Sequence, residues 1–163
     1  MRASARFFFV PRNDGLWNVP LPILPIELRR PHGRFLPTQG LLDSGATVSV
    51  LPYRLGLQLG ASWDETTTRV MLGGNLHGEA RVVLLEARVA GFDPVVLTFA
   101  WTQSERAPLI LGQINFFQSF DVHFQASRRQ YHVDVASRFD AQYRSGVSPS
   151  CLRKAATKAL VLA

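Results

Sequence analysis

The sequence predicts an all-β domain that carries one short helix near the C-terminal end of its body. Twelve glycines and ten prolines interrupt the chain often, which favours short strands over long helices. The segments between them are mostly short runs of apolar and β-branched residues, the usual composition of strands. Apolar residues make up 47% of the chain and charged residues 18%, which is typical of a globular domain with one hydrophobic core.

The N-terminal part of the chain predicts a series of extended segments. Residues 7–10 form a first short strand, residues 16–18 lead into a second, and residues 35–42 form an extended run after a polar turn at 29–34. Residues 19–28 are apolar but contain three prolines. Because proline cannot donate to a hydrogen-bond ladder, we expect these residues to form an edge or bulged strand rather than a central one.

The rest of the chain predicts a long hairpin, interior strands and the helix. The hairpin runs from residues 66–72 through a Gly-Gly-Asn turn at 73–75 to residues 79–89. The other expected elements, in chain order, are a strand at 48–51, a helical turn at 53–60, an interior strand at 95–101, a buried strand at 109–112, a short helix at 114–120, and a closing hairpin of 121–124 with 130–133. From about residue 136 the periodicity is lost, and only a weakly amphipathic helix at 152–163 is indicated.

The formal charge of +6 lies mainly in the C-terminal tail. From residue 138 onward there are five basic residues and one acidic residue, which leaves a net charge of only +2 for residues 1–137. A groove that binds nucleic acid needs clustered cations on the folded body. We therefore expect a solvated basic tail, flexible or helical, and no nucleic-acid partner.

Other sequence features exclude further classes of protein. The single cysteine, Cys151, rules out an intrachain disulfide framework and fits a reducing compartment, so a cytoplasmic location is expected. The apolar run at 7–10 is too short for a signal peptide, and no run approaches the ~20 residues that a membrane span requires. The four histidines show no metal-ligand spacing with cysteine or acidic residues, so neither a metal nor another cofactor is expected.

The sharpest local signal is Asp43-Ser44-Gly45, which follows two leucines and precedes Ala46 and a β-branched strand. An ionisable Asp at the end of an apolar strand is costly unless it is paired or hydrogen-bonded. The glycine would then let the backbone approach the carboxylate. The tripeptide alone fits an Asx-turn that closes a loop equally well.

A second signal lies 66 to 69 residues downstream of Asp43, where the segment Leu-Ile-Leu-Gly at 109–112 leads into the apolar helix. The glycine-tipped hairpin lies between the two signals. In this order the motifs resemble the retropepsin family of aspartic peptidases, and the resemblance covers roughly residues 19–135. It implies a closed β-barrel with a flap hairpin, preceded by a lead-in strand in residues 1–18 and followed by the basic tail at 136–163.

The resemblance also implies a function and a partner. In retropepsins each subunit contributes one aspartate, so the single motif here fits a homodimeric aspartic endopeptidase whose partner is a second copy of itself. Catalytic roles would fall to Asp43, Ser44 and Gly45, with Ser44 bonding across the dimer to brace the two loops. A peptide or protein substrate would add as a strand to the cleft. The flap and cleft residues that would contact it are Ala46, Leu72, Gly73, Gly74, Asn75 and Ile110, although the turn residues also fit an ordinary hairpin.

Three positions depart from the family pattern. Gln113 stands where many members have Arg, and Thr47 stands where retroviral members often have an acid. Those two groups usually pair, so we expect the dimer to be braced differently. Ala46 replaces a hydroxyl residue of the bilobed enzymes and cannot donate a hydrogen bond that would favour the ionised carboxylate, so we expect a pH optimum milder than strongly acidic.

Two other functions fit parts of the sequence. The same fold could serve as a catalytically inactive dimerisation or peptide-binding module. The intact tripeptide at 43–45 favours catalysis, because a binding module has no need of a like-charge pair at its axis. Nucleic-acid binding through residues 138–163 would predict that affinity is lost when the tail is removed.

Overall fold

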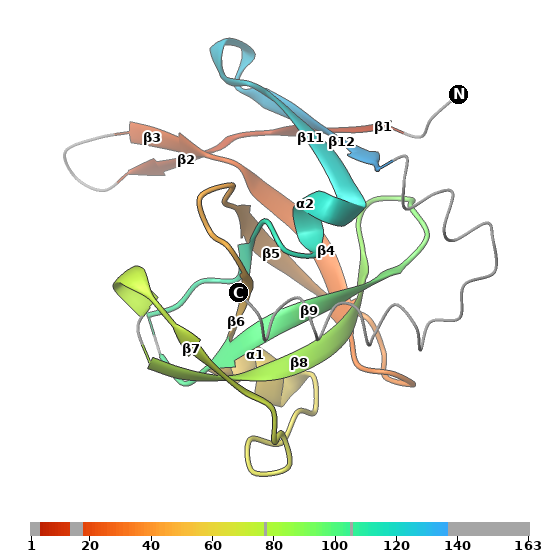
Figure 1. The fold of residues 1–163 in the computed structure, drawn as a ribbon. Coiled ribbons are helices and arrows are strands. Elements are labelled where there is room, and N and C mark those ends of the chain that lie inside the picture. Colours follow the sequence, from red (N-terminus) through yellow and green to blue (C-terminus); the bar gives the residue numbers. More distant parts are fainter. Residues whose placement is uncertain (1–3, 14–17, 77, 105, 137–163) are drawn as a thin grey trace.

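The computed structural model describes residues 4–13, 18–76, 78–104 and 106–136, and the predicted all-β fold class is confirmed (Figure 1). Predictions for Cys151 and for the tail beyond residue 136 lie outside the described residues. The strands are β1 (Ser4–Phe8), β2 (Val10–Asn13), β3 (Asn18–Leu21), β4 (Ile23–Arg29), β5 (Leu36–Leu42), β6 (Ser49–Pro52), β7 (Arg69–Leu72), β8 (Gly78–Arg88), β9 (Val95–Thr102), β10 (Ile110–Leu111), β11 (Phe120–Gln125) and β12 (Gln130–Val135). The helices are α1 (Tyr53–Gln58) and α2 (Phe116–Ser119), with short 3-10 turns η1 (Gly74–Leu76) and η2 (Ala126–Arg128).

Six strands close into the predicted barrel. Their order is β4-β5-β10-β6-β9-β8, and β8 pairs again with β4 to complete the circle. At this seam Arg88 donates to Glu27 at 2.6 Å, and Arg29 donates to Glu86 across the same two strands. The hydrogen bond from Arg88 lowers the pKa of Glu27. The seam is therefore held by side chains as well as by backbone pairing.

Strand β4 differs in part from the edge strand that its prolines predict. It pairs with β5 from Ile23 to Leu28, and at Pro25 that is the only neighbour it has. Beyond Pro25 no proline remains, every residue has an N–H to donate, and residues 27–29 pair with β8 as well. The edge-strand prediction is therefore wrong for the end of β4, because proline removes a donor only at its own position.

The body has two short helices rather than the one predicted, because the helical turn expected at 53–60 forms α1. Helix α2 lies within the segment predicted to be helical. A Cβ on Gly56 of α1 would overlap the indole of the buried Trp101, whose Nε1 donates to the Tyr53 carbonyl at 3.1 Å. Glycine thus allows α1 to lie directly on the barrel.

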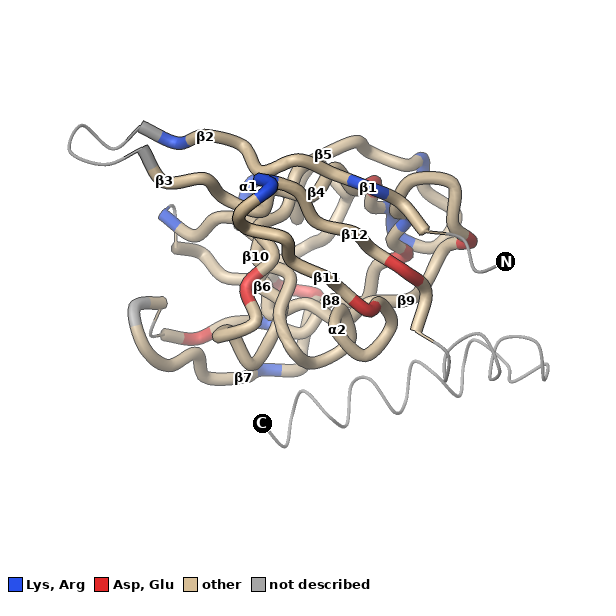
Figure 2. Tube along the Cα trace, turned by 90° about the horizontal axis from the view of Figure 1, so that it is seen from above, with Lys and Arg blue, Asp and Glu red and all other residues tan. Residues whose placement is uncertain are grey.

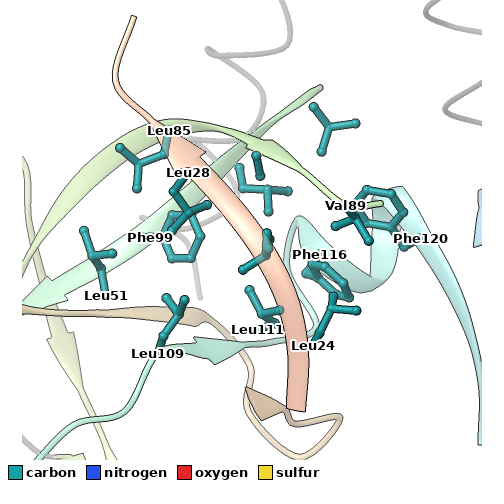
Figure 3. Close-up of a cluster of buried hydrophobic side chains, with 14 of the residues drawn as sticks. Leu24, Leu28, Leu51, Leu85, Val89, Phe99, Leu109, Leu111, Phe116 and Phe120 are labelled. Atoms are coloured by element: carbon teal, nitrogen blue, oxygen red, sulfur yellow. The ribbon is translucent and has the colours of Figure 1, made fainter. Parts of the chain in front are cut away.

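The hydrophobic core fills the barrel and continues under α2. Figure 3 shows leucines from β4, β6, β8 and β10 pointing toward one another and toward Phe99, with Phe116 and Phe120 of the α2 region at one end. The interior strand predicted at 95–101 is confirmed, since β9 is almost entirely buried. A smaller cluster of Val50, Ala107 and Ile110 lies apart from this core.

The predicted closing hairpin of β11 and β12 is confirmed, and it forms a three-stranded sheet with β1. The buried Tyr131 of β12 joins this sheet to the barrel, because its hydroxyl donates to the Ile23 carbonyl at 2.7 Å. The ring of Phe7 stacks on Tyr131 with centroids 5.5 Å apart. Strand β1 is therefore part of the same folded body as the barrel.

Replacing Tyr131 with Phe is expected to lower the free energy of unfolding at neutral pH by about 1–3 kcal/mol, because the Ile23 carbonyl loses its donor. Burial also raises the pKa of Tyr131. Wild-type stability from the neutral phenol is therefore present below the ordinary tyrosine pKa, about 10, and declines as the pH rises toward the raised value. Urea unfolding at neutral and alkaline pH should show a shallower alkaline decline for Tyr131→Phe, and equal declines would contradict this assignment.

Candidate active site

Asp43 lies directly after β5, at the point where β10 separates β5 from β6. Strand β10 runs parallel to β5 and antiparallel to β6, so the loop that joins β5 to β6 must pass the end of β10. The backbone N–H of Asp43 donates to the Leu111 carbonyl at 3.1 Å, and that of Leu41 donates to the Leu109 carbonyl at 2.8 Å. The acidic residue is thus fixed by a segment far away in the sequence.

Within the loop, the backbone turns back toward the Asp43 carboxylate. The N–H of Gly45 donates to Asp43 Oδ1 at 2.9 Å, and the N–H of Ala46 donates to the Asp43 carbonyl at 3.2 Å. A Cβ at Gly45 would lie 3.2 Å from Asp43 Oδ1, so a larger residue would require the carboxylate to shift by a few tenths of an ångström. This is the geometry of an Asx-turn, so the local hydrogen bonds fit both interpretations of the tripeptide, and its surroundings must distinguish them.

The segment after β10 holds the Asp43 loop through three hydrogen bonds. The N–H of Gln113 donates to the Ala46 carbonyl at 2.8 Å, and the N–H of Ile114 donates to the Thr47 carbonyl at 2.9 Å. The side-chain Nε2 of Gln113 donates to the Ser44 carbonyl at 2.7 Å. Gln113, which the sequence marks only as a departure from the family, therefore braces the loop within its own chain.

Gly112 and Ser49 bring β10 and β6 close together behind the loop. A Cβ on Gly112 would lie 2.5 Å from the Val48 carbonyl oxygen and 2.8 Å from that of Ala46. The N–H of Gly112 donates to the hydroxyl of Ser49 at 3.0 Å, and Ser49 is fully buried. The glycine that ends the 109–112 segment is needed for this contact, whereas nothing in the sequence singles out Ser49.

A cavity of about 600 Å³ opens beside the Asp43 loop. Its lining includes Asp43 and Thr47 as the residues with polar side chains. The whole lining is Asp43, Gly45, Ala46, Thr47, Val48, Val50, Leu72, Gly73, Gly74, Leu76, Pro108 and Ile110. It thus brings together seven of the residues predicted for the site, namely Asp43, Gly45, Ala46, Leu72, Gly73, Gly74 and Ile110.

Two predicted residues do not line this cavity, and five lining residues were not predicted. Ser44 is exposed on the loop, and Asn75 belongs to η1. The unpredicted ones are Thr47, Val48, Val50, Leu76 and Pro108. Thr47, Val48 and Val50 directly follow the Asp-Ser-Gly-Ala motif. Because successive side chains of a strand point to opposite faces, Val48 and Val50 share a face and could have been assigned to the cleft from their positions.

The predicted hairpin of β7 and β8 covers this cavity. Its tip is formed by Gly73 and η1, and Gly74 has a φ of 65°, which glycine adopts without strain. From the tip, Leu76 packs against the small cluster of Val50, Ala107 and Ile110. The hairpin therefore touches the floor of the cavity as well as its rim.

The charges of the described chain do not gather at this site. Figure 2 shows basic residues spread over the molecule and interspersed with acidic ones, and the cavity lining contains no basic residue. Within the described ranges no group of three or more His, Cys, Asp or Glu residues is arranged to hold a metal ion. None of the helices in these ranges is long and apolar enough to span a membrane.

Comparisons with known proteins relate this fold to a retropepsin-like one. No protein-family model matches the chain, and no curated protein matches it in sequence. Among solved structures, the chain is similar to a retropepsin-like aspartic protease from Rickettsia conorii, with a TM-score of 0.52 and 13% sequence identity. The match covers 83% of this chain and 97% of that one. The two share a fold. At 13% identity, this similarity shows a shared architecture and does not by itself show a shared activity.

Proposed function

We propose that this protein is an aspartic endopeptidase that works as a homodimer, with Asp43 of each subunit as its catalytic acid. The observation that carries the proposal is the position of Asp43 on an otherwise mostly apolar cavity beneath a glycine-tipped hairpin. The likeness of the barrel to that of an aspartic protease supports it. The proposed catalytic domain spans residues 19–135, and β1 of the preceding segment packs with it. A cytoplasmic location is a further prediction.

In the proposed mechanism two Asp43 carboxyl groups meet at the dimer axis. Two carboxylates in contact cannot both ionise, so they hold one proton between them. The ionised carboxylate removes a proton from water as its oxygen attacks the scissile carbonyl carbon, and the protonated carboxyl donates to the carbonyl oxygen. As the tetrahedral intermediate collapses, the carboxyl that took the water proton gives it to the departing nitrogen and the C–N bond breaks. The other carboxylate recovers its proton from a hydroxyl of the intermediate. The Gln113 amide would hold each loop in position through the Ser44 carbonyl.

The cavity favours an extended peptide with apolar side chains. A peptide between the hairpin and the floor would bond with its backbone as an added strand. Its side chains would meet the side chains of Val48, Val50 and Ile110, which carry no hydrogen-bonding group. A charged side chain there would lose its hydration without a partner, so we expect apolar residues beside the cleaved bond.

Ala46→Ser is expected to move the acidic limb of the pH–rate profile to lower pH by about one unit. Ala46 lies beside Asp43 in the cavity lining, and a serine hydroxyl there would add a donor that favours the ionised carboxylate. A hydrogen bond to a charged group contributes roughly 1.5 kcal/mol, or about one pH unit. The check is kcat/KM measured across the acidic range for both proteins. An unchanged limb would mean that the hydroxyl does not reach the carboxylate.

Cleavage of a peptide library by wild type and Asp43→Asn, side by side, tests the proposed function. Mass spectrometry should find internal cleavage by the wild type between apolar residues, and none by the variant. Equal cleavage by both proteins would rule out Asp43 as the acid. Binding of library peptides without cleavage by either protein would favour the alternative, a catalytically inactive peptide-binding module.

A further inference from the structure

Strands β2 and β3 form a two-stranded ribbon that is separate from the barrel and from the terminal sheet. Figure 1 shows it projecting from the body of the molecule. A two-stranded ribbon without a packed face is only marginally stable in water. A further surface that packs on the ribbon would therefore stabilise it.

One face of the ribbon carries three apolar side chains and one arginine, and two of the apolar side chains are exposed. The register pairs Val10 with Leu21 and Arg12 with Val19, so these four side chains share a face. Val10 is 45% exposed and Val19 is 44% exposed. Exposure alternates along residues 4–10, which adds Phe8, 62% exposed, to the same side. We call Phe8, Val10, Val19 and Leu21 the ribbon face, and Arg12 lies on the same side.

The two edges of the ribbon are poor places for another strand to add. Pro11 and Pro20 lie opposite each other. Opposed prolines have no N–H groups to exchange, so they occupy a pair whose donors and acceptors point outward, away from the partner strand. Each outer edge consequently lacks one of the N–H groups that an added strand would use. What covers this ribbon must therefore pack on its face.

The base of the ribbon is fixed beside the proposed catalytic acid. Pro22 follows β3 directly, and its carbonyl accepts a hydrogen bond at 3.0 Å from the N–H of Leu42, the residue before Asp43. A subunit that brings a second Asp43 to the first must therefore lie next to this ribbon. Two-fold symmetry then places each ribbon next to the other subunit.

We propose that the ribbon face is a contact surface for a second copy of this chain, which completes the Asp43 site. This assignment rests on the proposed homodimeric function. A second copy packed on this face would cover the exposed apolar side chains without adding a strand at the proline-containing edges. It would also lie beside the Asp43 loop, to which the base of the ribbon is hydrogen-bonded. Contact between the ribbon and the second copy sets the distance between the two carboxyl groups.

Sedimentation velocity over a concentration series tests the surface with Val10→Asp and a matched control, Leu57→Asp. Leu57 of α1 is 47% exposed and lies outside the ribbon. Burying a carboxylate costs desolvation even where Arg12 on the same face could pair with it, so Val10→Asp should raise the dimer dissociation constant by at least about tenfold. The control should match the wild type. Peptide cleavage by Val10→Asp should be lost at low protein concentration and recover at high concentration.

A second variant keeps the test independent of any folding defect in the first. Val19→Ser makes a smaller polar change on the same face, and it should weaken the dimer in the same direction while far-UV circular dichroism matches the wild type. Wild-type dimers unaffected by either substitution would overturn the ribbon assignment and leave the proposed function standing. Monomeric variants that cleave peptides at the wild-type rate would support the ribbon surface and overturn the shared-acid mechanism. A wild type that stays monomeric at every concentration would overturn both.

Discussion

Asp43→Asn is expected to lower kcat/KM for peptide cleavage by at least about 10³-fold, since proton transfer by a positioned acid or base contributes roughly 10²–10⁴-fold. An amide cannot take a proton from water at the pH of the reaction. Asparagine has nearly the same shape, and its oxygen can still accept the hydrogen bond from Gly45, so the loop should keep its conformation. Unchanged circular dichroism and thermal unfolding would show that the loss is chemical.

The same variant should also inactivate the wild type when subunits exchange. With about a ninefold excess of Asp43→Asn, random pairing leaves roughly one dimer in a hundred with two acids. Because the mixture holds about ten times as many dimers as the wild type alone, the activity of a fixed amount of wild type should fall about tenfold after mixing. An Asp43→Asn, Val10→Asp double variant should inhibit much less, because its dimer contact is weakened. Full wild-type activity in the presence of the single variant would mean that one chain is sufficient for catalysis.

Gly112→Ala is expected to destabilise the fold by about 3 kcal/mol or more and to abolish activity, because its methyl group would overlap fixed backbone. The added Cβ would lie 2.5 Å from the Val48 carbonyl oxygen, and a backbone atom cannot move aside as a flexible side chain can. Separating the segments would also stretch the bonds from Gln113 and Ile114 to the Asp43 loop. Urea unfolding and kcat/KM measure the two effects.

Gly91→Ala is the matched control for Gly112→Ala. A Cβ at Gly91 has no atom within 4 Å, and its φ is not positive, so alanine fits there without strain. Its unfolding free energy should stay within about 0.5 kcal/mol of the wild type. Similar stability for both variants would show that the backbone around Gly112 can yield.

Features with a local signal could be predicted from the sequence. The Asp43 motif, the hairpin turn at 73–75 and the glycine at 112 each depend on neighbouring residues, and the structure has a loop, a hairpin tip and a close contact at these places. Helix α1 was indicated only as a turn, because its stability comes from contact with Trp101, whose position depends on the fold.

Features that depend on pairing between distant residues could not be predicted. The pairing of β4 with β8 joins residues about 60 positions apart in the sequence. The residue pattern of either strand does not indicate which strand it pairs with. Leu76 and Pro108 line one cavity because the hairpin tip packs against β10 and the residues beside it. The bond from Gln113 to Ser44 spans 69 residues, so the sequence shows an uncharged residue at 113 but not what it contacts.

The long-range bond between Asp43 and Leu111 has a consequence during protein synthesis. Asp43 is synthesised before Leu111, whose carbonyl fixes it and which lies 68 positions later. Until that later stretch has emerged and inserted between β5 and β6, Asp43 lacks the hydrogen bond that ties it to the barrel. The order of translation thus delays formation of the proposed Asp43 site until most of the barrel strands have been made.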